Sequence, residues 1–154
     1  MQTESVVKAR HVMTSNPICC LPTDTAQHVA GLLRDNDIGA VPVVKDQKTR
    51  KLVGIITDRD LCCAVVAAGL EGKAILIRRI LSKNPVKCHV EDNLERCIES
   101  MEWYQNRRLP VVDDHDRCIG IISQADMALK AKPPEVSRIM AGISKVRVRE
   151  SSVA

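Results

Sequence analysis

The stretch Gly54-Ile55-Ile56-Thr57-Asp58-Arg59-Asp60 recurs as Gly120-Ile121-Ile122-Ser123-Gln124-Ala125-Asp126, at an offset of 66 residues. Working outward from it, residues 10–46 align with residues 78–114, and motifs such as Pro-Val-Val stand at the same place in both copies. Two residues are missing from the second copy in a polar turn, where length changes are tolerated. The chain is therefore a tandem of two copies of roughly 60 residues each.

Each copy predicts the same order of elements: strand, helix, strand, strand, helix. Asp24 with Gln27, and Asp92 with Glu95, have the spacing of a capping box and indicate where the first helix of each copy begins. Polar turns between apolar runs predict a hairpin in each copy. The expected strands are residues 17–21, 40–44 and 51–57 in the first copy and 85–90, 109–112 and 118–123 in the second. The helix that ends each copy is expected at 58–68 and 124–131.

These elements predict a mixed α/β fold, of the α+β kind, with two β-α-β-β-α repeats. The hairpin strands are apolar almost throughout, as in strands covered on both faces. One unit alone is marginal in size, so two units are expected to pack sheet to sheet about a pseudo-twofold axis. The predicted boundaries are 8–69 for the first domain, 70–77 for a linker, 78–131 for the second domain and 132–154 for a basic C-terminal tail. Within that tail, the alternation at 145–149 suggests either an edge strand or a solvated terminus.

Composition excludes several classes of function. The chain has 154 residues, a net charge of +4 and 45% hydrophobic residues, which suits a globular core. Its only aromatic residues are Trp103 and Tyr104, so a surface that stacks single-stranded bases is hard to build. Basic residues concentrate only after residue 131, which makes nucleic acid an unlikely partner. There is no long apolar run and no secretory signal, so we expect a cytoplasmic protein without membrane contact.

The seven cysteines fit a reducing compartment. No Cys-x-x-Cys spacing occurs, so small buried hydrophobic residues explain them better than a metal or redox site. Signatures of hydrolases, zinc proteases and dinucleotide enzymes are also missing from the sequence. We therefore expect no catalytic residues, no metal site and no required cofactor. A small thiol- or metal-dependent enzyme finds no support in the residues.

Three motifs together resemble a tandem pair of CBS domains, the Bateman module, as a free-standing protein. They are the lead-in His11-Val12-Met13-Thr14, the stretch from Asn36 to Val44, and the stretch from Gly54 to Asp60. Their order, spacing and duplication make the resemblance specific over about residues 8–131. It implies homodimerisation and the binding of AMP, ADP, ATP or S-adenosylmethionine as a regulatory ligand in the clefts between the repeats.

The resemblance also implies which residues hold the ligand. Ribose and phosphate would contact two hydroxyl and carboxylate pairs, Thr57 with Asp60 and Ser123 with Asp126. A carboxylate suits ribose because it accepts from both hydroxyls, and a helix N-terminus suits phosphate.

Adenine would be recognised near the starts of the Pro-Val-Val strands. The residues there are Ile38, Gly39 and Ala40 in the first copy and Arg107 and Arg108 in the second. The two arginines would also neutralise phosphates, as Arg59 would in the first cleft. A polyphosphate should therefore favour the site served by Arg107 and Arg108.

Other interpretations stay open at this point. Thr57 with Asp60, and Ser123 with Asp126, also fit a capping box, and capping does not exclude ligand binding. Arg107 and Arg108 equally fit an exposed pair that favours a helix dipole. The alternative function is a structural or interaction protein with vestigial nucleotide sites, which contacts a partner through its dimer surface or basic tail. In either case the signal would pass to a separate, unknown downstream protein.

Overall fold

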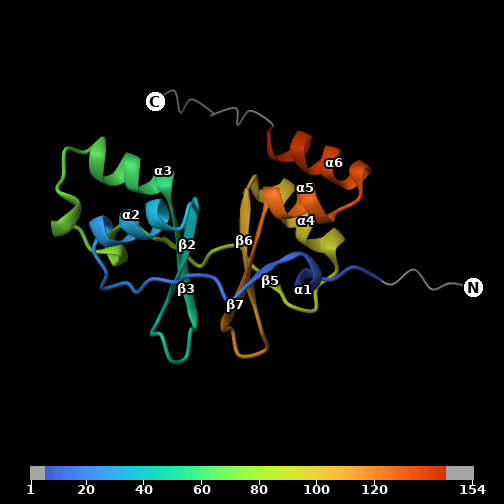
Figure 1. The fold of residues 1–154 in the computed structure, drawn as a ribbon, viewed down its shortest axis with the longest axis horizontal. Coiled ribbons are helices and arrows are strands. Elements are labelled where there is room, and N and C mark those ends of the chain that lie inside the picture. Colours follow the sequence, from blue (N-terminus) through green and yellow to red (C-terminus); the bar gives the residue numbers. More distant parts are fainter. Residues whose placement is uncertain (1–5, 145–154) are drawn as a thin grey trace, which may run out of the picture.

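The computed structural model describes residues 6–144 and contains two sheets that face each other, with helices outside them (Figure 1). The elements up to residue 66 are α1 (Ala9–Val12), β1 (Thr14–Ser15), α2 (Ala26–Asp35), β2 (Ala40–Val44), β3 (Leu52–Thr57), α3 (Asp58–Leu61) and the π-helix η1 (Cys62–Val66). The remaining elements are the 3₁₀ helices η2 (Gly72–Ala74) and η3 (Ile77–Arg79), β4 (Ser82–Lys83), β5 (Cys88–His89), α4 (Leu94–Tyr104), β6 (Arg108–Val112), β7 (Cys118–Ser123), α5 (Gln124–Lys130) and α6 (Pro133–Ile143).

Both predicted hairpins are present. Strands β2 and β3 pair antiparallel with Ala40 opposite Thr57, and β6 and β7 pair antiparallel with Arg108 opposite Ser123. Each hairpin has an irregularity at its last Val-Val step, which is a further sign of duplication. The sheets have the strand orders β2-β3-β4 and β1-β7-β6-β5. The mixed fold with two sheet-and-helix repeats is thus confirmed.

The strands expected at 17–21 and 85–90 are much shorter than predicted. The first is reduced to a single bridge between Cys20 and Val43, and the second is β5 alone. Both stretches begin at a proline, which has no N–H to donate to a ladder. The preceding residues, Asn16 and Asn84, both have φ of 49°, so the chain turns there instead of extending.

The predicted N-cap of the first helix in each copy is wrong by one residue. Helix α2 follows Thr25, whose hydroxyl accepts from the N–H of His28, and α4 follows Asn93. Asp24 and Asp92 do not cap these helices. Their carboxylates instead accept from backbone N–H groups three residues earlier, at Leu21 and His89. Short polar side chains often satisfy a local turn in this way, which competes with capping.

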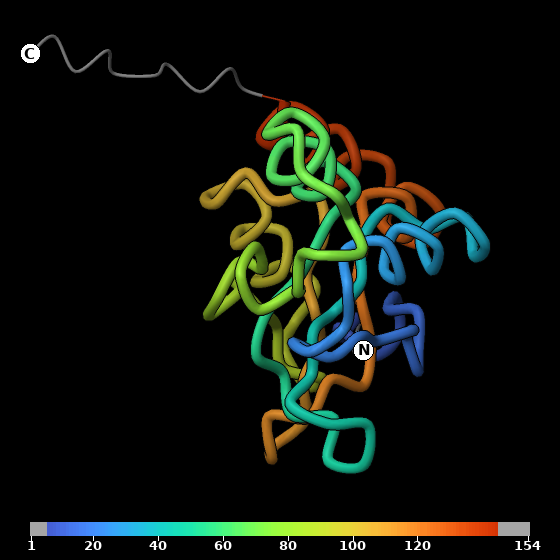
Figure 2. The backbone as a smooth tube through the Cα atoms, turned by 90° about the vertical axis from the view of Figure 1, so that its left-hand side faces the viewer, coloured from blue at the N-terminus to red at the C-terminus, as the bar shows by residue number. Residues whose placement is uncertain are grey.

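Each repeat is completed by the segment that precedes the other repeat. We call these segments lead-ins: residues 8–15 precede the first repeat, and residues 75–83 precede the second. Strand β1 pairs with β7 of the second repeat, and β4 pairs with β3 of the first. Accordingly, Ala9 and Val12 are buried in the core of the second repeat, and Ile75 and Ile77 in the core of the first. Figure 2 shows the N-terminal segment in blue beside the strands of the second repeat in orange. Residues 70–77, expected to be a linker, therefore contribute to a core.

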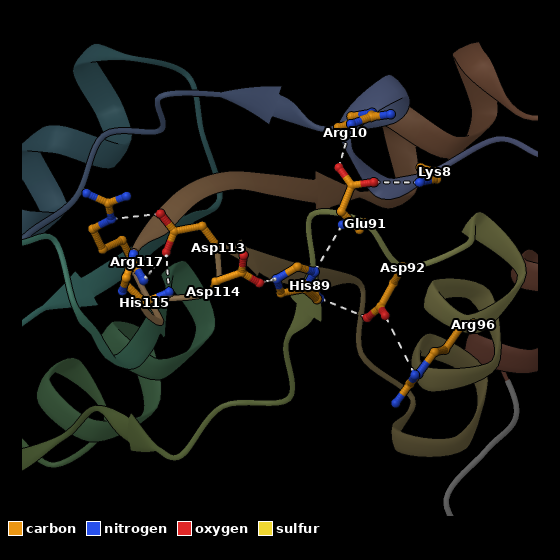
Figure 3. A network of polar contacts seen from close by, with 10 residues as sticks. All are labelled: Lys8, Arg10, His89, Glu91, Asp92, Arg96, Asp113, Asp114, His115 and Arg117. Atoms are coloured by element: carbon orange, nitrogen blue, oxygen red, sulfur yellow. Dashed lines mark hydrogen bonds and ion pairs between the residues drawn. The ribbon is translucent and has the colours of Figure 1, made fainter.

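Ion pairs hold the N-terminal lead-in on the second repeat. Lys8 and Arg10 both bind the carboxylate of Glu91 (Figure 3). The same network continues through His89, whose Nε2 lies 2.7 Å from Oδ1 of Asp114. Because these groups are partly exposed, the pairs fix the position of the lead-in more than they stabilise the fold.

The two repeats meet along a third, small core between the sheets. It consists of Cys19, Val44, Leu52, Val112 and Cys118. Two backbone hydrogen bonds cross the junction at pseudo-equivalent positions. The N–H of Leu52 donates to the carbonyl of Asp116 at 3.0 Å, and the N–H of Cys118 donates to the carbonyl of Arg50 at 2.9 Å. Sheet-to-sheet packing with pseudo-twofold symmetry follows from these contacts.

Part of the segment expected to be a tail forms helix α6. Ile139 and Ile143 are buried in the second core together with Met101 and Met127. Nε of Arg138 donates to Oε1 of Glu102 on α4 at 2.9 Å, which links the two helices. Pro133 and Pro134, at the first turn, are compatible with a helix start because the N–H groups there have no intrahelical acceptor. The alternation noted at 145–149 lies outside the described residues.

The lead-in of the second repeat packs directly on β3. We therefore expect that position 54 requires glycine. A Cβ at Gly54 would lie 2.4 Å from Cδ1 of Leu81 and 2.9 Å from the carbonyl oxygen of Ser82. We expect Gly54→Ala to lower the free energy of unfolding by about 1–3 kcal/mol, because β4 must move away. Gly31→Ala is the matched control, since its Cβ would meet no atom closer than 4.0 Å in the interior of α2. This control should stabilise by up to about 1 kcal/mol in urea unfolding. Equal effects of the two substitutions would show that position 54 does not require glycine.

The burial of α6 leads to a second prediction. Ile139→Ala should destabilise the protein by about 2–5 kcal/mol, because Ile139 is 1% exposed in the second core. Ser137→Ala, on the exposed side of the same helix, should change stability by less than about 0.5 kcal/mol. Chemical denaturation of both variants measures the difference. A neutral Ile139→Ala would show that α6 does not pack on this core in solution.

Candidate functional site

The two predicted hydroxyl and carboxylate pairs lie at the N-termini of α3 and α5. Thr57 Oγ1 accepts from the N–H of Asp60 at 3.1 Å, and Asp60 Oδ2 accepts from the N–H of Thr57 at 2.9 Å. Ser123 and Asp126 form the same two bonds, at 3.1 and 2.8 Å. Both motifs are therefore capping boxes, as one of the open interpretations held. Capping leaves the second oxygen of each carboxylate available for another partner.

The second oxygen differs between the two copies. Within residues 6–144, Oδ1 of Asp60 accepts no hydrogen bond. Oδ1 of Asp126 accepts from Thr14 Oγ1 at 3.2 Å. Thr14 lies on β1, which the exchange of lead-ins places beside β7. Thr14 was not among the site residues predicted from the sequence. Its position at the end of the motif His11-Val12-Met13-Thr14 could have indicated it.

The residues predicted to recognise adenine lie directly beside these caps. The N–H of Asp58 donates to the carbonyl of Gly39 at 3.1 Å, and the N–H of Gln124 donates to the carbonyl of Arg107 at 3.0 Å. The hairpin register puts Ala40 opposite Thr57. Ile38 is exposed, Gly39 is half-buried and Ala40 is buried. In each copy the start of one strand and the end of its neighbour thus meet at one helix N-terminus.

Arg108 connects the two copies. A Cβ at Gly39 would lie 2.2 Å from Nη2 of Arg108, so this guanidinium packs directly on the backbone of Gly39. Arg108 begins β6 of the second repeat, whereas Gly39 precedes β2 of the first. Both arginines were expected to serve the second cleft. Arg108 instead lies against Gly39 of the first repeat. Glycine at position 39 is what leaves room for it.

The other two predicted cations are exposed. Arg59 lies in the first turn of α3, where its N–H donates to Asp58 Oδ1, and Arg107 lies just before β6. Because exposed guanidinium groups lose little hydration on meeting an anion, both can approach a phosphate. The start of α3 thus combines a carboxylate oxygen that accepts no hydrogen bond among the described residues with the guanidinium groups of Arg59 and, beside Gly39, Arg108.

Two hollows in the structure lie away from these residues. A cavity of about 420 Å³ is lined mainly by apolar residues of α2, α3 and η1, among them Ala30, Leu61 and Val65. A second hollow lies along α4, beside Trp103 and Tyr104. None of the predicted site residues lines either one.

In the part of the chain that the structure describes, no group of three or more His, Cys, Asp or Glu side chains is placed to hold a metal ion. No helix among the described residues is long and apolar enough to cross a membrane.

Comparison with known proteins gives a consistent result for the fold. The family model described as CBS domain matches the chain twice, at residues 9–67 and 77–132. Hypoxic response protein 1 of Mycobacterium tuberculosis is 31% identical over 120 residues, which is 78% of this chain and 82% of that protein. Inosine-5'-monophosphate dehydrogenase of Methanocaldococcus jannaschii is 34% identical over 137 residues, which is 89% of this chain. The chain spans only 26% of the dehydrogenase, so that match concerns a part of the enzyme.

Solved structures with the same arrangement include three with bound groups. Hypoxic response protein I with two coordinated zinc ions has a TM-score of 0.73 and 29% identity, over 82% of this chain and all of that one. A CBS domain pair in complex with 5'-methylthioadenosine and S-adenosyl-L-methionine has a TM-score of 0.72 and 26% identity, over 81% and 95%. CBSX2 in complex with AMP has a TM-score of 0.69 and 25% identity, over 81% and 96%.

The cap geometry yields a prediction about stability. Thr57→Ala removes the side-chain acceptor for the N–H of Asp60 and should destabilise the protein by about 1 kcal/mol. Thr57→Ser keeps the hydroxyl and serves as the control, with a change well below that of the alanine variant. Urea unfolding of the two variants gives the comparison. If both lose the same stability, the methyl group of Thr57 matters and its capping bond does not.

Proposed function

Because the chain belongs to the CBS domain family and carries two tandem copies of that domain, we propose that it is a non-catalytic regulatory module for an adenosine-containing ligand. The ligand class comprises AMP, ADP, ATP and S-adenosylmethionine. It binds in the seam between the repeats, next to the N-termini of α3 and α5. Two of the similar structures hold AMP or S-adenosyl-L-methionine, which supports this class of ligand.

The observation that carries the proposal is the free oxygen of Asp60. One oxygen of this carboxylate caps α3 and is held in place by the N–H of Thr57. The other is fixed in direction by that bond and accepts from a ribose hydroxyl. A charged acceptor held rigidly binds a hydroxyl more strongly than a mobile one, since less conformational freedom is lost.

Arg108 supplies the opposite charge at the same site. Its guanidinium already lies across the seam on Gly39, so it reaches the phosphate of a nucleotide whose ribose is bound to Asp60. The exposed side chain of Arg59, in the first turn of α3, adds a second guanidinium that reaches the phosphate. Ribose and phosphate are thus contacted from both repeats at once.

The two sites are unequal in this proposal. At the second site Oδ1 of Asp126 already accepts from Thr14, so a ribose hydroxyl must displace an existing hydrogen bond. At the first site no such exchange is needed. The first ligand therefore binds at Asp60, and the second site fills at higher concentration or with a different ligand.

A regulatory output follows from the bridging geometry. A ligand held by both repeats favours one relative orientation of the two sheets, and its effect is limited by its difference in affinity for the alternative orientations. The proposed assembly is a homodimer, and the proposed receiver of the change is a separate protein.

Calorimetric titration with AMP, ADP, ATP and S-adenosylmethionine tests the proposal. Asp60→Asn should weaken the tighter site by roughly tenfold or more, because it removes a charged acceptor while its amide oxygen still caps α3. Asp58→Asn is the matched control. It makes the same change of charge two residues away, where the exposed carboxylate accepts from the N–H of Arg59, and should leave affinity within about twofold.

Two results would contradict the proposal. A folded wild-type protein, freed of co-purified nucleotide by unfolding and refolding, that binds none of the four ligands would refute the function. Equal weakening by Asp60→Asn and Asp58→Asn would show that Asp60 acts only through its charge at a distance and does not contact the ribose.

A further inference from the structure

Two cysteines from different repeats meet in the small core between the sheets. Cys19 lies in the segment before α2, and Cys118 is the first residue of β7. Cys19 is 8% exposed and Cys118 is fully buried. They are separated by most of the folded chain in sequence, so only the packing of the two sheets brings them together.

One guanidinium contacts the surroundings of both thiols. Nη2 of Arg50 lies 3.2 Å from Cys19 Sγ and donates to the carbonyl of Pro17 at 2.8 Å. Nε of the same side chain donates to the carbonyl of Cys118 at 3.2 Å. Arg50 is therefore fixed by backbone acceptors on both sides of the junction. A positive charge held against a sulfur favours its thiolate form.

The two thiols are electrostatically different. The pKa of Cys19 is lowered by the hydrogen-bond interaction of its sulfur with the Cys118 side chain, and the charge of Arg50 lowers it as well against the opposing effect of burial. The pKa of Cys118 is raised by that same hydrogen bond and by its own burial. Cys19 is thus the better nucleophile, and Cys118 lies next to it as a neutral thiol.

Cysteines in the repeat cores have the opposite character. Burial raises the pKa of Cys20 to about 12. The pKa of Cys88 is raised by its hydrogen bond with Cys97 and by burial. Cys88 and Cys97 are also a neighbouring pair, but within residues 6–144 no guanidinium donates a hydrogen bond to their sulfur atoms, and only the more distant charge of Arg96 acts on Cys88. They therefore provide an internal control for the effect of Arg50.

The fold does not require this cluster. At the pseudo-equivalent positions on the other side of the junction, Lys87 replaces Cys19, Asp116 replaces Arg50 and Leu52 replaces Cys118. Lys87 and Asp116 form an ion pair there, and Leu52 fills the same small core. The same packing is thus achieved without a thiol, so the pair and its guanidinium are a separate chemical feature of one side.

We propose that Cys19 and Cys118 are an oxidation site, which a small hydroperoxide such as hydrogen peroxide converts into a disulfide that joins the two repeats. The Cys19 thiolate attacks one peroxide oxygen, the O–O bond breaks, and hydroxide leaves as Cys19 becomes a sulfenic acid. The sulfur of Cys118 then attacks the Cys19 sulfur, the S–O bond breaks, and the thiol proton leaves with the oxygen as water. In total, two thiols and one hydrogen peroxide give one disulfide and two waters.

The cross-link acts at a defined place. Cys118 begins β7 and packs near Leu52, the first residue of β3, whereas Ser123 and Thr57 are the last residues of these strands. The disulfide therefore joins the repeats at the far ends of the strands from the proposed nucleotide site. It closes a loop of about 100 residues, which restricts the unfolded chain strongly and stabilises the folded one. The inference does not depend on nucleotide binding.

Peptide mapping after oxidation tests the proposal. The parent protein carries Cys62→Ala and Cys63→Ala, because both of these cysteines are exposed. Hydrogen peroxide at low molar excess should remove two hydrogens from the intact mass and join tryptic peptides 11–34 and 118–130. The oxidised form should unfold at a higher temperature, and a dithiol reductant should reverse both changes.

Three variants of this parent separate the roles. Cys118→Leu places the residue of the equivalent position there, so the fold is kept, and sulfenic acid at Cys19 should now accumulate and react with dimedone. Cys19→Ser should give neither disulfide nor dimedone adduct at this site. Arg50→Gln should slow the reaction at Cys19 by several fold, as expected from loss of the charge.

Two outcomes would overturn the proposal. The first is a folded protein in which Cys88 and Cys97 are oxidised as fast as Cys19 and Cys118. The second is a dimedone adduct at Cys118 in the Cys19→Ser variant, with none at Cys19 in the Cys118→Leu variant.

Discussion

The exchange of lead-in segments is the constraint on which the rest of the structure depends. Met13 packs on Gly120 in the second repeat, and Leu81 packs on Gly54 in the first, at pseudo-equivalent positions. A side chain at either glycine would occupy the space of the incoming segment. Because each core contains residues that precede the other repeat, neither repeat has a complete core alone. The seam between the repeats is therefore held in place by the chain itself, without help from a ligand.

The candidate site uses groups that also stabilise the fold. Asp60 and Asp126 cap helices with one carboxylate oxygen, and this bond fixes the direction of the other. Capping and ligand binding are therefore compatible interpretations of the same residues. The rigidity that capping provides lowers the conformational entropy lost on binding, which suits the proposed contact between the carboxylate and a sugar.

Duplication has produced two similar halves with different chemistry. Oδ1 of Asp126 accepts from Thr14, and Arg108 crosses to Gly39 of the first repeat, so the two proposed nucleotide sites differ. Helix α6 covers the second repeat only, through Ile139 and Ile143. At the junction, a thiol pair with Arg50 on one side corresponds to an ion pair on the other. Apart from α6, these differences arise from one or a few side chains on a backbone whose unusual φ angles recur in pairs, such as Asn16 with Asn84.

The sequence by itself determined the duplication, both hairpins and the helices after them, because periodicity and repeated motifs are local signals. It also identified Thr57, Asp60, Ser123 and Asp126 as neighbours at helix starts, since their spacing is local. Only the tertiary structure decided that each lead-in joins the opposite repeat, that Arg108 reaches Gly39 and that Cys19 meets Cys118. These contacts join residues far apart in the chain, and their partners depend on how two sheets pack, which spacing within one segment does not encode.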